Sequence, residues 1–236
     1  MLEVVPGVYK LSGPWDQADL GASVYLVAEG GDLTLIDSGY GGKAVQILKR
    51  VHELGFAAHR ITHIIATHHH PDHVGSLAAL KKMTGAKVIA HPADAPYIEG
   101  SLPQPGPFRP TLYKAVWHPL LKLLQTEPAA VDMAVSDGDE LPVAGGIRII
   151  HTPGHTPGSI CLYLKQKRLV FTGDLIARRL DIKLPSLAFS ADIPELLQSI
   201  HKLSGIEFDI ACFGHGWPMK QDANRKVEEF SQQYPL

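Results

Sequence analysis

Short apolar runs alternate with helical patterns along most of the chain, and glycine, proline and charged residues separate them. Two of the runs flank Glu29-Gly30-Gly31-Asp32, which has the composition of a hairpin turn. Apolar positions at helical spacing up to Leu54 predict a helix that Gly55 ends. In this first part of the chain the pattern predicts, in order, strands over Val24–Val27 and Leu33–Ile36, a helix over Lys43–Leu54, a strand over Ile61–Ala66, a helix over Ser76–Met83 and a strand over Lys87–Ala90.

The same alternation returns after residue 146. A hairpin is expected across Lys165-Gln166-Lys167, and Asp192 stands near the start of an expected helix. The elements predicted here are strands over Ile147–Ile150, Ser159–Leu164 and Arg168–Phe171, a helix over Pro194–Leu203, a strand over Phe208–Phe213 and a helix over Lys220–Gln233.

The region from Pro92 to Val135 interrupts this pattern. Prolines crowd residues 103–110, which excludes a regular helix or a central strand there. A helical pattern follows over Leu112–Gln125, interrupted by Pro119. We interpret the region as an insertion that lies over the core of a single domain spanning residues 1–236.

The two halves of the chain echo each other. In each half a pair of strands is followed by a helix and then by a strand that ends in histidine. Leu33–Gly39 and Leu169–Asp174 are both strand endings that carry an acid and a glycine. Strands mixed with helices in two similar halves predict an α+β fold, in which two sheets pack face to face with helices outside.

Composition narrows the class of protein. With 236 residues, 45% of them hydrophobic and 19% charged, the chain can bury a substantial core. A net charge of −2 gives no electrostatic reason to expect nucleic acid as a partner. No apolar run is long enough to cross a bilayer, and the N-terminus lacks the pattern of a signal peptide. Cys161 and Cys212 lie inside apolar runs and are expected to be buried, reduced thiols, so we expect a cytoplasmic protein.

The segment Thr67–His73 carries the strongest chemical signal, because four histidines and an aspartate directly follow an expected strand. His68 and His70 point to the same side of an extended segment. By the same alternation His69 points away from them, and we assign it a structural or solvent-facing role. Imidazole and carboxylate together suit zinc and other borderline divalent metals. The segment therefore predicts a metal site.

Three later strand endings strengthen this prediction. His155 lies in a loop with two prolines and two glycines, Asp174 follows a glycine at the end of a strand, and His215 stands between two glycines. One such residue at a strand end is ordinary. Its repetition predicts a shared site on one rim of the sheets.

With these motifs, the chain resembles the metallo-β-lactamase fold superfamily, in its zinc hydrolase branch with glyoxalase II and the acyl-homoserine lactonases. The matching motifs run in the superfamily's order from Asp37 to His215. The resemblance implies a four-layer αβ/βα sandwich of two mixed sheets with the metals at one edge. It also implies that Asp37 orients the ligand loop, although a simple turn-capping aspartate is the alternative. The implied ligands are His68, His70 and His155 for the first metal, Asp72, His73 and His215 for the second, and Asp174 as the bridge between them.

Departures within the superfamily narrow the assignment. No cysteine stands at a ligand position, and Asp174 is present where the true β-lactamases lack a bridging acid, so a β-lactamase is disfavoured. His70 stands where the flavodiiron branch carries glutamate. Residues 175–179 match neither the glycine-rich segment of glyoxalase II nor the tyrosine-bearing segment of the lactonases. The substrate therefore stays open within the superfamily.

The implied chemistry is hydrolysis with two divalent metal ions, expected to be Zn²⁺, with iron or manganese as alternatives. Two such ions about 3.5–4 Å apart can share a hydroxide that attacks a carbonyl. Asp72 lies between ligand histidines, and we hypothesise that it passes a proton to the leaving group. A small-molecule carbonyl ester, lactone or thioester is the expected substrate, and no membrane partner or oligomeric state is indicated.

The insertion is the expected specificity element. Its aromatic and apolar residues would cover a pocket above the metals or would merely pack on the core, namely Tyr97, Phe108, Leu112, Trp117 and Leu120. Three alternative functions stay open. They are a mononuclear iron sulfur dioxygenase that uses only His68, His70 and His155, a phosphodiesterase, and a metal-stabilised binding module. A phosphodiesterase usually needs basic groups, and the only basic cluster is formed by Arg178, Arg179 and Lys183.

Overall fold

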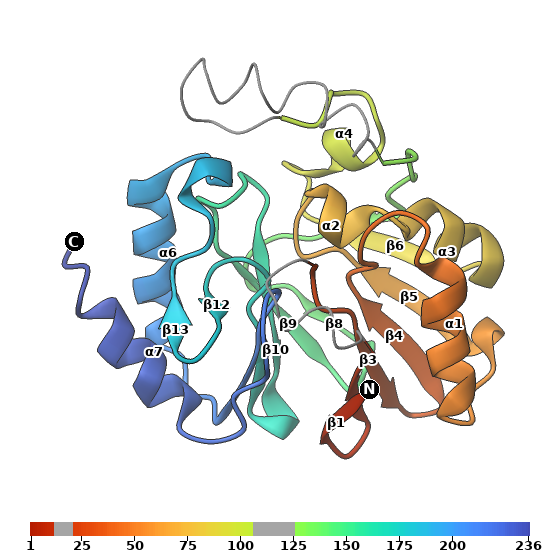
Figure 1. The fold of residues 1–236 in the computed structure, drawn as a ribbon, viewed down its shortest axis with the longest axis horizontal. Helices are drawn as coiled ribbons and strands as arrows, with labels where there is room; N and C mark the ends of the chain where they lie inside the picture. The colour runs from red at the N-terminus through yellow and green to blue at the C-terminus, as the bar shows by residue number, and fades with distance from the viewer. Residues whose placement is uncertain (12–20, 106–125) are drawn as a thin grey trace.

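Two mixed β-sheets form the centre of the protein, and helices cover their outer faces (Figure 1). The structure is a computed structural model that describes residues 1–11, 21–105 and 126–236. The first sheet has the order β1-β2-β3-β4-β5-β6-β7. Its strands are β1 (Leu2–Val5), β2 (Val8–Lys10), β3 (Tyr25–Glu29), β4 (Asp32–Ile36), β5 (Ile61–Ile65), β6 (Lys87–Ala90) and β7 (Met133–Ala134).

The second sheet has the order β14-β11-β10-β9-β8, and a separate pair, β12 and β13, lies beside it. The strands are β8 (Glu140–Leu141), β9 (Ile147–His151), β10 (Ile160–Leu164), β11 (Leu169–Phe171), β12 (Ala177–Arg178), β13 (Ile182–Lys183) and β14 (Ile210–Cys212).

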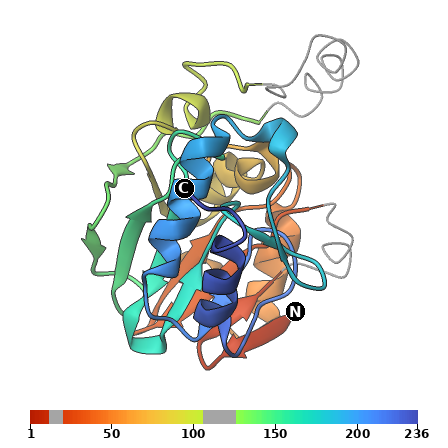
Figure 2. The same cartoon turned by 90° about the vertical axis from the view of Figure 1, so that its left-hand side faces the viewer.

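Longer helices pack on the outer face of each sheet, which gives the four layers (Figures 1 and 2). α1 (Ala44–Glu53) and α3 (Leu77–Thr84) cover the first sheet, whereas α6 (Ile193–Ser204) and α7 (Ala223–Ser231) cover the second. The shorter helices are α2 (Pro71–Val74), α4 (Ala95–Ile98) and the 3₁₀ turns η2 (Ala58–Arg60), η3 (Lys165–Lys167) and η4 (Leu187–Phe189). The predicted αβ/βα sandwich is confirmed.

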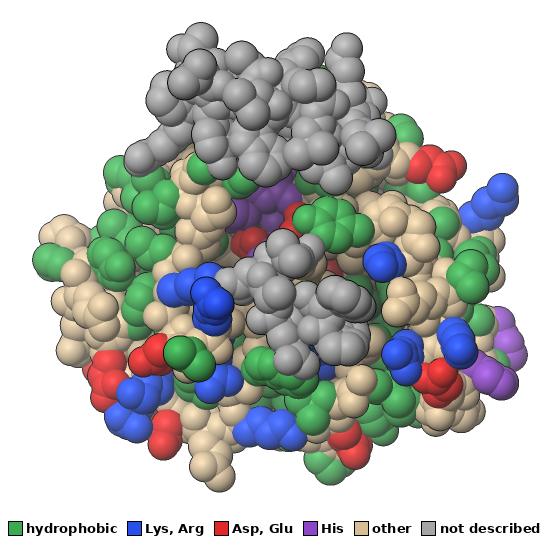
Figure 3. All heavy atoms as spheres, in the orientation of Figure 1, with side chains coloured by type: hydrophobic (Ala, Val, Ile, Leu, Met, Phe, Trp, Pro, Cys, Tyr) green, Lys and Arg blue, Asp and Glu red, His purple; other side chains and the backbone are tan. Residues whose placement is uncertain are grey.

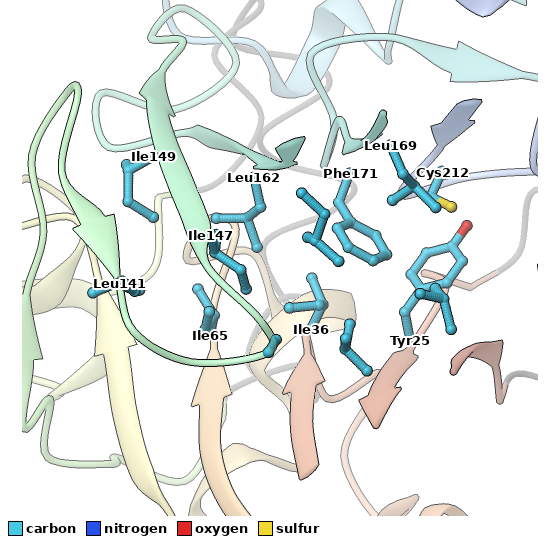
Figure 4. Close-up of a cluster of buried hydrophobic side chains, with 14 of the residues drawn as sticks. Tyr25, Ile36, Ile65, Leu141, Ile147, Ile149, Leu162, Leu169, Phe171 and Cys212 are labelled. Atoms are coloured by element: carbon cyan, nitrogen blue, oxygen red, sulfur yellow. The ribbon is translucent and has the colours of Figure 1, made fainter. Parts of the chain in front are cut away.

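The inner faces of the two sheets share one apolar core (Figure 4). Ile36 and Ile65 of the first sheet face Leu162 of the second, and the Tyr25 and Phe171 rings lie 5.1 Å apart. Because helices cover the other face, the central strand β10 is buried at every position, so its sequence shows no alternation. Burial of apolar surface on both sides holds the sheet ends, and therefore the loops that follow them, in fixed places.

Most of the predicted elements are found within two or three residues of their expected bounds. The hairpin of β3 and β4 turns at Gly30 and Gly31, whose positive φ angles of 61° and 96° suit glycine. α6 begins at the expected Asp192, whose Oδ1 accepts a hydrogen bond from the Glu195 amide. Cys161 and Cys212 are buried and unpaired, as predicted.

Several short strands were not predicted. β1 and β2 precede the first expected strand, and β7, β8, β12 and β13 have two residues each. β7 pairs with β6, so the end of the region interpreted as an insertion belongs to the first sheet. The expected helix over Leu112–Gln125 lies outside the described residues. Within the part that is described, no helix has the length and apolarity needed to cross a membrane.

Candidate metal centre

Four strands deliver the predicted ligands to one edge of the sandwich. β5 leads into the segment with His68 and His70, and α2 then carries Asp72 and His73. His155, Asp174 and His215 follow β9, β11 and β14 of the second sheet. Histidine and acidic side chains come to the surface together in a hollow on the face shown in Figure 3.

The structure brings all seven side chains together. The first cluster is His68, His70 and His155, and the second cluster is Asp72, His73 and His215; within each, the potential ligand atoms lie within 4.8 Å of one another. Asp174 lies between the clusters: its Oδ2 is 3.5 Å from His155 Nε2 and 3.2 Å from His215 Nε2. Its Oδ1 is 3.3 Å from His73 Nε2.

The hydrogen bonding of these side chains fits metal ions. Nε2 of His68 and His70 are buried and have no hydrogen-bond partner among the described residues. His73 Nε2 and Asp174 Oδ1 lie 3.3 Å from each other but make no hydrogen bond within the described part of the chain. Buried polar atoms are normally paired, because an unpaired one costs about 1–3 kcal/mol. His155 Nε2 and His70 Nδ1 lie at hydrogen-bonding distance from each other, 3.0 Å apart. A divalent cation with nitrogen and oxygen ligands would satisfy the unpaired atoms.

Burial and charge divide the histidines into two groups. Burial lowers the pKa of His68 and His70 well below the ordinary value, and it lowers the pKa of His155 to about 4. Burial alone would also lower the pKa of His215, but Asp174 and Asp72 raise it to about 10. The first cluster is therefore neutral at pH 7, the form in which imidazole binds a metal.

The carboxylates of the centre stay ionised. Burial would raise the pKa of Asp174, but His215 and His73 hold it well below the ordinary value. The pKa of Asp72 is lowered against the effect of burial by His73 and His215. The pKa of His73 is raised, since the charges of Asp174, Asp37 and Asp72 outweigh its burial.

Asp37 contacts His73 of the second cluster on the side of the ring that faces away from the other ligands. Its Oδ1 accepts a hydrogen bond from the Thr67 amide at 2.8 Å. Its Oδ2 accepts one from the Thr67 hydroxyl at 2.8 Å and lies 2.7 Å from His73 Nδ1. Asp37 has a φ of 61°, a conformation that aspartate tolerates better than most residues. The carboxylate thus leaves Nε2 of His73 to face the centre.

His69 is fully buried, so the solvent-facing alternative for this residue is wrong. Its ring stacks on Tyr97 with 4.4 Å between the centroids, and its Nδ1 lies 2.8 Å from Gln104 Oε1. Gln104 Nε2 also donates to the His69 carbonyl at 3.0 Å. The predicted structural role fits these contacts, and Tyr97 packs on the ligand segment through His69.

The predicted pocket residues Phe108, Leu112, Trp117 and Leu120 lie outside the described residues. Other residues near the centre were not singled out from the sequence. Burial and the charges of Asp72 and Asp174 raise the pKa of Tyr40 to about 12. The Phe189 ring lies 6.4 Å from that of His70. Tyr40 directly follows Asp37-Ser38-Gly39, so its place in the sequence was a usable signal.

The loop that carries His215 is fixed on both sides. Arg178 Nη1 donates to the carbonyls of Trp217 and Pro218 at 3.2 and 2.9 Å, and the Arg178 amide donates to the His215 carbonyl at 2.9 Å. The Lys10 ammonium lies 5.4 Å from the centroid of the Trp217 ring. These contacts give Arg178 a structural role.

Comparison with known proteins agrees with this geometry. The sequence model of the Metallo-beta-lactamase superfamily matches residues 18–215. A probable metallo-hydrolase, YflN of Bacillus subtilis, is 27% identical over 216 residues, which cover 84% of this chain and 81% of that protein. A hydroxyacylglutathione hydrolase of Rhizobium meliloti is 28% identical over 162 residues, 68% of this chain but only 50% of that protein.

A solved structure shows the same fold. The metallo-beta-lactamase family protein TTHA1429 of Thermus thermophilus superposes with a TM-score of 0.76 at 23% identity. The match covers 98% of this chain and 80% of that one.

Proposed function

The chain belongs to the metallo-beta-lactamase superfamily, and from this premise we propose that it is a dinuclear zinc hydrolase of small carbonyl esters, lactones or thioesters. The observation that carries the proposal is the convergence of seven ligand-type side chains with several unpaired buried atoms. The Rhizobium relative is by name a hydrolase of hydroxyacylglutathione, a thioester, which supports a substrate of this class.

Each side chain has a role in this proposal. The first cluster would hold one ion and the second cluster the other, and Asp174 contacts His155 of the first cluster and His215 of the second. Two divalent ions supply a water nucleophile at neutral pH and polarise the carbonyl of the substrate. Asp37 keeps His73 in the tautomer and orientation that the centre requires.

Asp72 is the proposed proton carrier. Its side chain is 19% exposed, so it is less enclosed than Asp174 at 9%, and its Oδ2 lies 3.2 Å from His215 Nε2. Because its pKa is lowered, the carboxylate is ionised at neutral pH and can accept a proton. It would then hand this proton to the leaving group.

A hydrolysis screen with metal analysis tests the proposal. Protein purified without added zinc is assayed for metal content and for cleavage of lactones, thioesters, aryl esters and phosphodiesters. We expect two zinc ions per chain and activity on one of the first three classes. Asp174→Ala should lower turnover by about 100-fold or more while the protein stays folded.

Other outcomes would contradict the proposal. Full turnover by Asp174→Ala would remove the bridging role of that residue. A single bound iron with oxygen-dependent activity would indicate the sulfur dioxygenase instead. Two bound ions without cleavage of any class, and a stability loss as the sole effect of Asp174→Ala, would indicate the metal-stabilised binding module.

A further inference from the structure

Asp94 is a buried acid that touches both segments of the first cluster, although it belongs to neither. It lies between β6 and α4, and its exposed fraction is 1%. Placing a carboxylate in such a position is costly unless hydrogen bonds satisfy it. Neither the ligand assignment nor the proposed chemistry gives this residue a role.

The partners of Asp94 flank the ligands of the first cluster. Its Oδ2 accepts a hydrogen bond from the His69 amide at 2.9 Å, and His69 stands between His68 and His70. The same oxygen accepts one from the hydroxyl of Thr156, the neighbour of His155, at 2.7 Å. Its Oδ1 accepts one from the Gly158 amide at 2.7 Å.

The local structure is shaped to admit this carboxylate. A Cβ on Gly158 would lie 2.6 Å from Asp94 Cγ, so a larger residue there would displace the acid. The Thr156 hydroxyl, which donates to Asp94, also lies 2.8 Å from the hydroxyl of Ser159. Charge-assisted hydrogen bonds of this kind are shorter and roughly twice as strong as neutral ones.

We propose that Asp94 is a positioning residue that sets the separation of His68 and His70 from His155, and thereby the affinity of the first cluster for its metal ion. The separation that it fixes is the one at which His70 Nδ1 and His155 Nε2 face each other at 3.0 Å. This inference rests on the proposed function, because it assigns the first cluster to a metal ion.

The arrangement predicts that the effect is confined to one of two ions. Asp94 contacts residues beside the ligands of the first cluster. Asp37 contacts His73 of the second cluster directly, and it reaches the first cluster only through Thr67, whose hydroxyl lies 3.1 Å from His68 Nδ1. Loss of Asp94 should therefore weaken the ion of the first cluster, whereas loss of Asp37 should weaken chiefly the ion of the second. A residue that merely stabilised the fold would weaken both ions together.

The test uses Asp94→Asn in the full chain, with Asp37→Asn and Asp132→Asn beside it. In Asp94→Asn, an NH₂ group replaces one of the two carboxylate oxygens. This NH₂ group is a donor, and it would face a donor of the protein where the oxygen accepted a hydrogen bond. Asp132 is the matched control, because its Oδ2 accepts from the Val88 amide and from Lys81 Nζ, both at 2.7 Å. Zinc affinity is measured by chelator competition, and the cobalt-loaded protein gives the visible spectrum of each site.

We expect Asp94→Asn to weaken one zinc ion about 10- to 100-fold and to change the cobalt spectrum of that site only. Asp37→Asn should weaken chiefly the other ion, and Asp132→Asn should leave both affinities unchanged. Thr156→Val, which removes one of the three donors, should give a smaller loss at the same ion as Asp94→Asn. This milder variant also serves if Asp94→Asn does not fold.

Two results would overturn the inference. The first is that Asp94→Asn and Thr156→Val bind both ions as tightly as the wild type. The second is that either variant weakens both ions equally, in step with its loss of thermal stability. Wild-type protein that binds no divalent metal would refute the proposed function itself, and the inference would fall with it.

Discussion

His73 and His215 must lose protons before they can hold a metal ion. Carboxylates raise the pKa of both rings, that of His215 to about 10, so both carry a proton at pH 7 in the protein without metal. We expect zinc binding at pH 7 to release about two protons. Because the protonated form competes with the metal, affinity should fall as the pH falls, by about tenfold per unit for each proton released.

Calorimetry in buffers of different ionisation enthalpy measures this release directly. The first cluster contributes nothing to it at pH 7, since its histidines have lowered pKa values and are already neutral. Zinc binding with no dependence on the buffer would contradict the prediction.

At the level of single residues, the sequence indicated which ligand-type side chains lie together, but not which residues hold them in place. The resemblance to the superfamily implied the seven residues of the centre, and the structure brings all seven together. The role of Asp94 could not be predicted from the sequence, because its partners are far away along the chain. His69, Thr156 and Gly158 are 25, 62 and 64 residues from it. For His69, alternation indicated the direction of the side chain but not that Tyr97 and Gln104 enclose it.

Among the elements, the turn after β14 leaves no room for a side chain at Gly214. A Cβ on Gly214 would overlap Asp174 Oδ1 and would lie 2.8 Å from the Gly173 carbonyl oxygen. Gly214→Ala should therefore displace Asp174 or the loop of His215. We expect metal affinity and turnover to fall about 10- to 100-fold. Chelator competition and the hydrolysis assay measure both effects.

Gly205→Ala is the matched control for that change. Gly205 follows α6, and the nearest atom to its added Cβ would be the Lys202 carbonyl oxygen at an ordinary 3.6 Å. This variant should keep wild-type affinity. Wild-type metal binding by Gly214→Ala would show that the turn has more room than the structure indicates.

The elements that were predicted are those with a long apolar pattern. β10 and α6 have five and twelve residues, and burial determines their composition. β7 and β8 have two residues each, too few to show a period, and they exist because a neighbouring strand offers unpaired backbone groups. Tertiary pairing of this kind leaves little trace in the local sequence.

At the scale of the whole molecule, the metal centre joins the two halves of the sandwich. Four of its residues follow β5 of the first sheet, and His155, Asp174 and His215 follow strands of the second. Bound metal should therefore stabilise the pair of sheets and not one sheet alone. At a free zinc concentration 1,000 times the dissociation constant, each ion adds about 4 kcal/mol to the free energy of unfolding.

Urea unfolding with buffered zinc and with a chelator checks this expectation. The chelator should shift the whole unfolding transition to a lower urea concentration. Spectroscopic signals that report on the first sheet and on the second should shift by the same amount. An unchanged midpoint, or a shift confined to one half, would show that the ions do not connect the sheets.

Trp217 gives the protein a built-in optical probe. It stands two residues after His215, its exposed fraction is 40%, and the Lys10 ammonium lies 5.4 Å from its ring. The sequence contains three tryptophans, and the others are Trp15 and Trp117. With those two replaced by phenylalanine, the remaining indole would emit from the edge of the metal centre. Its fluorescence would then follow the filling of the centre in real time, without any attached dye.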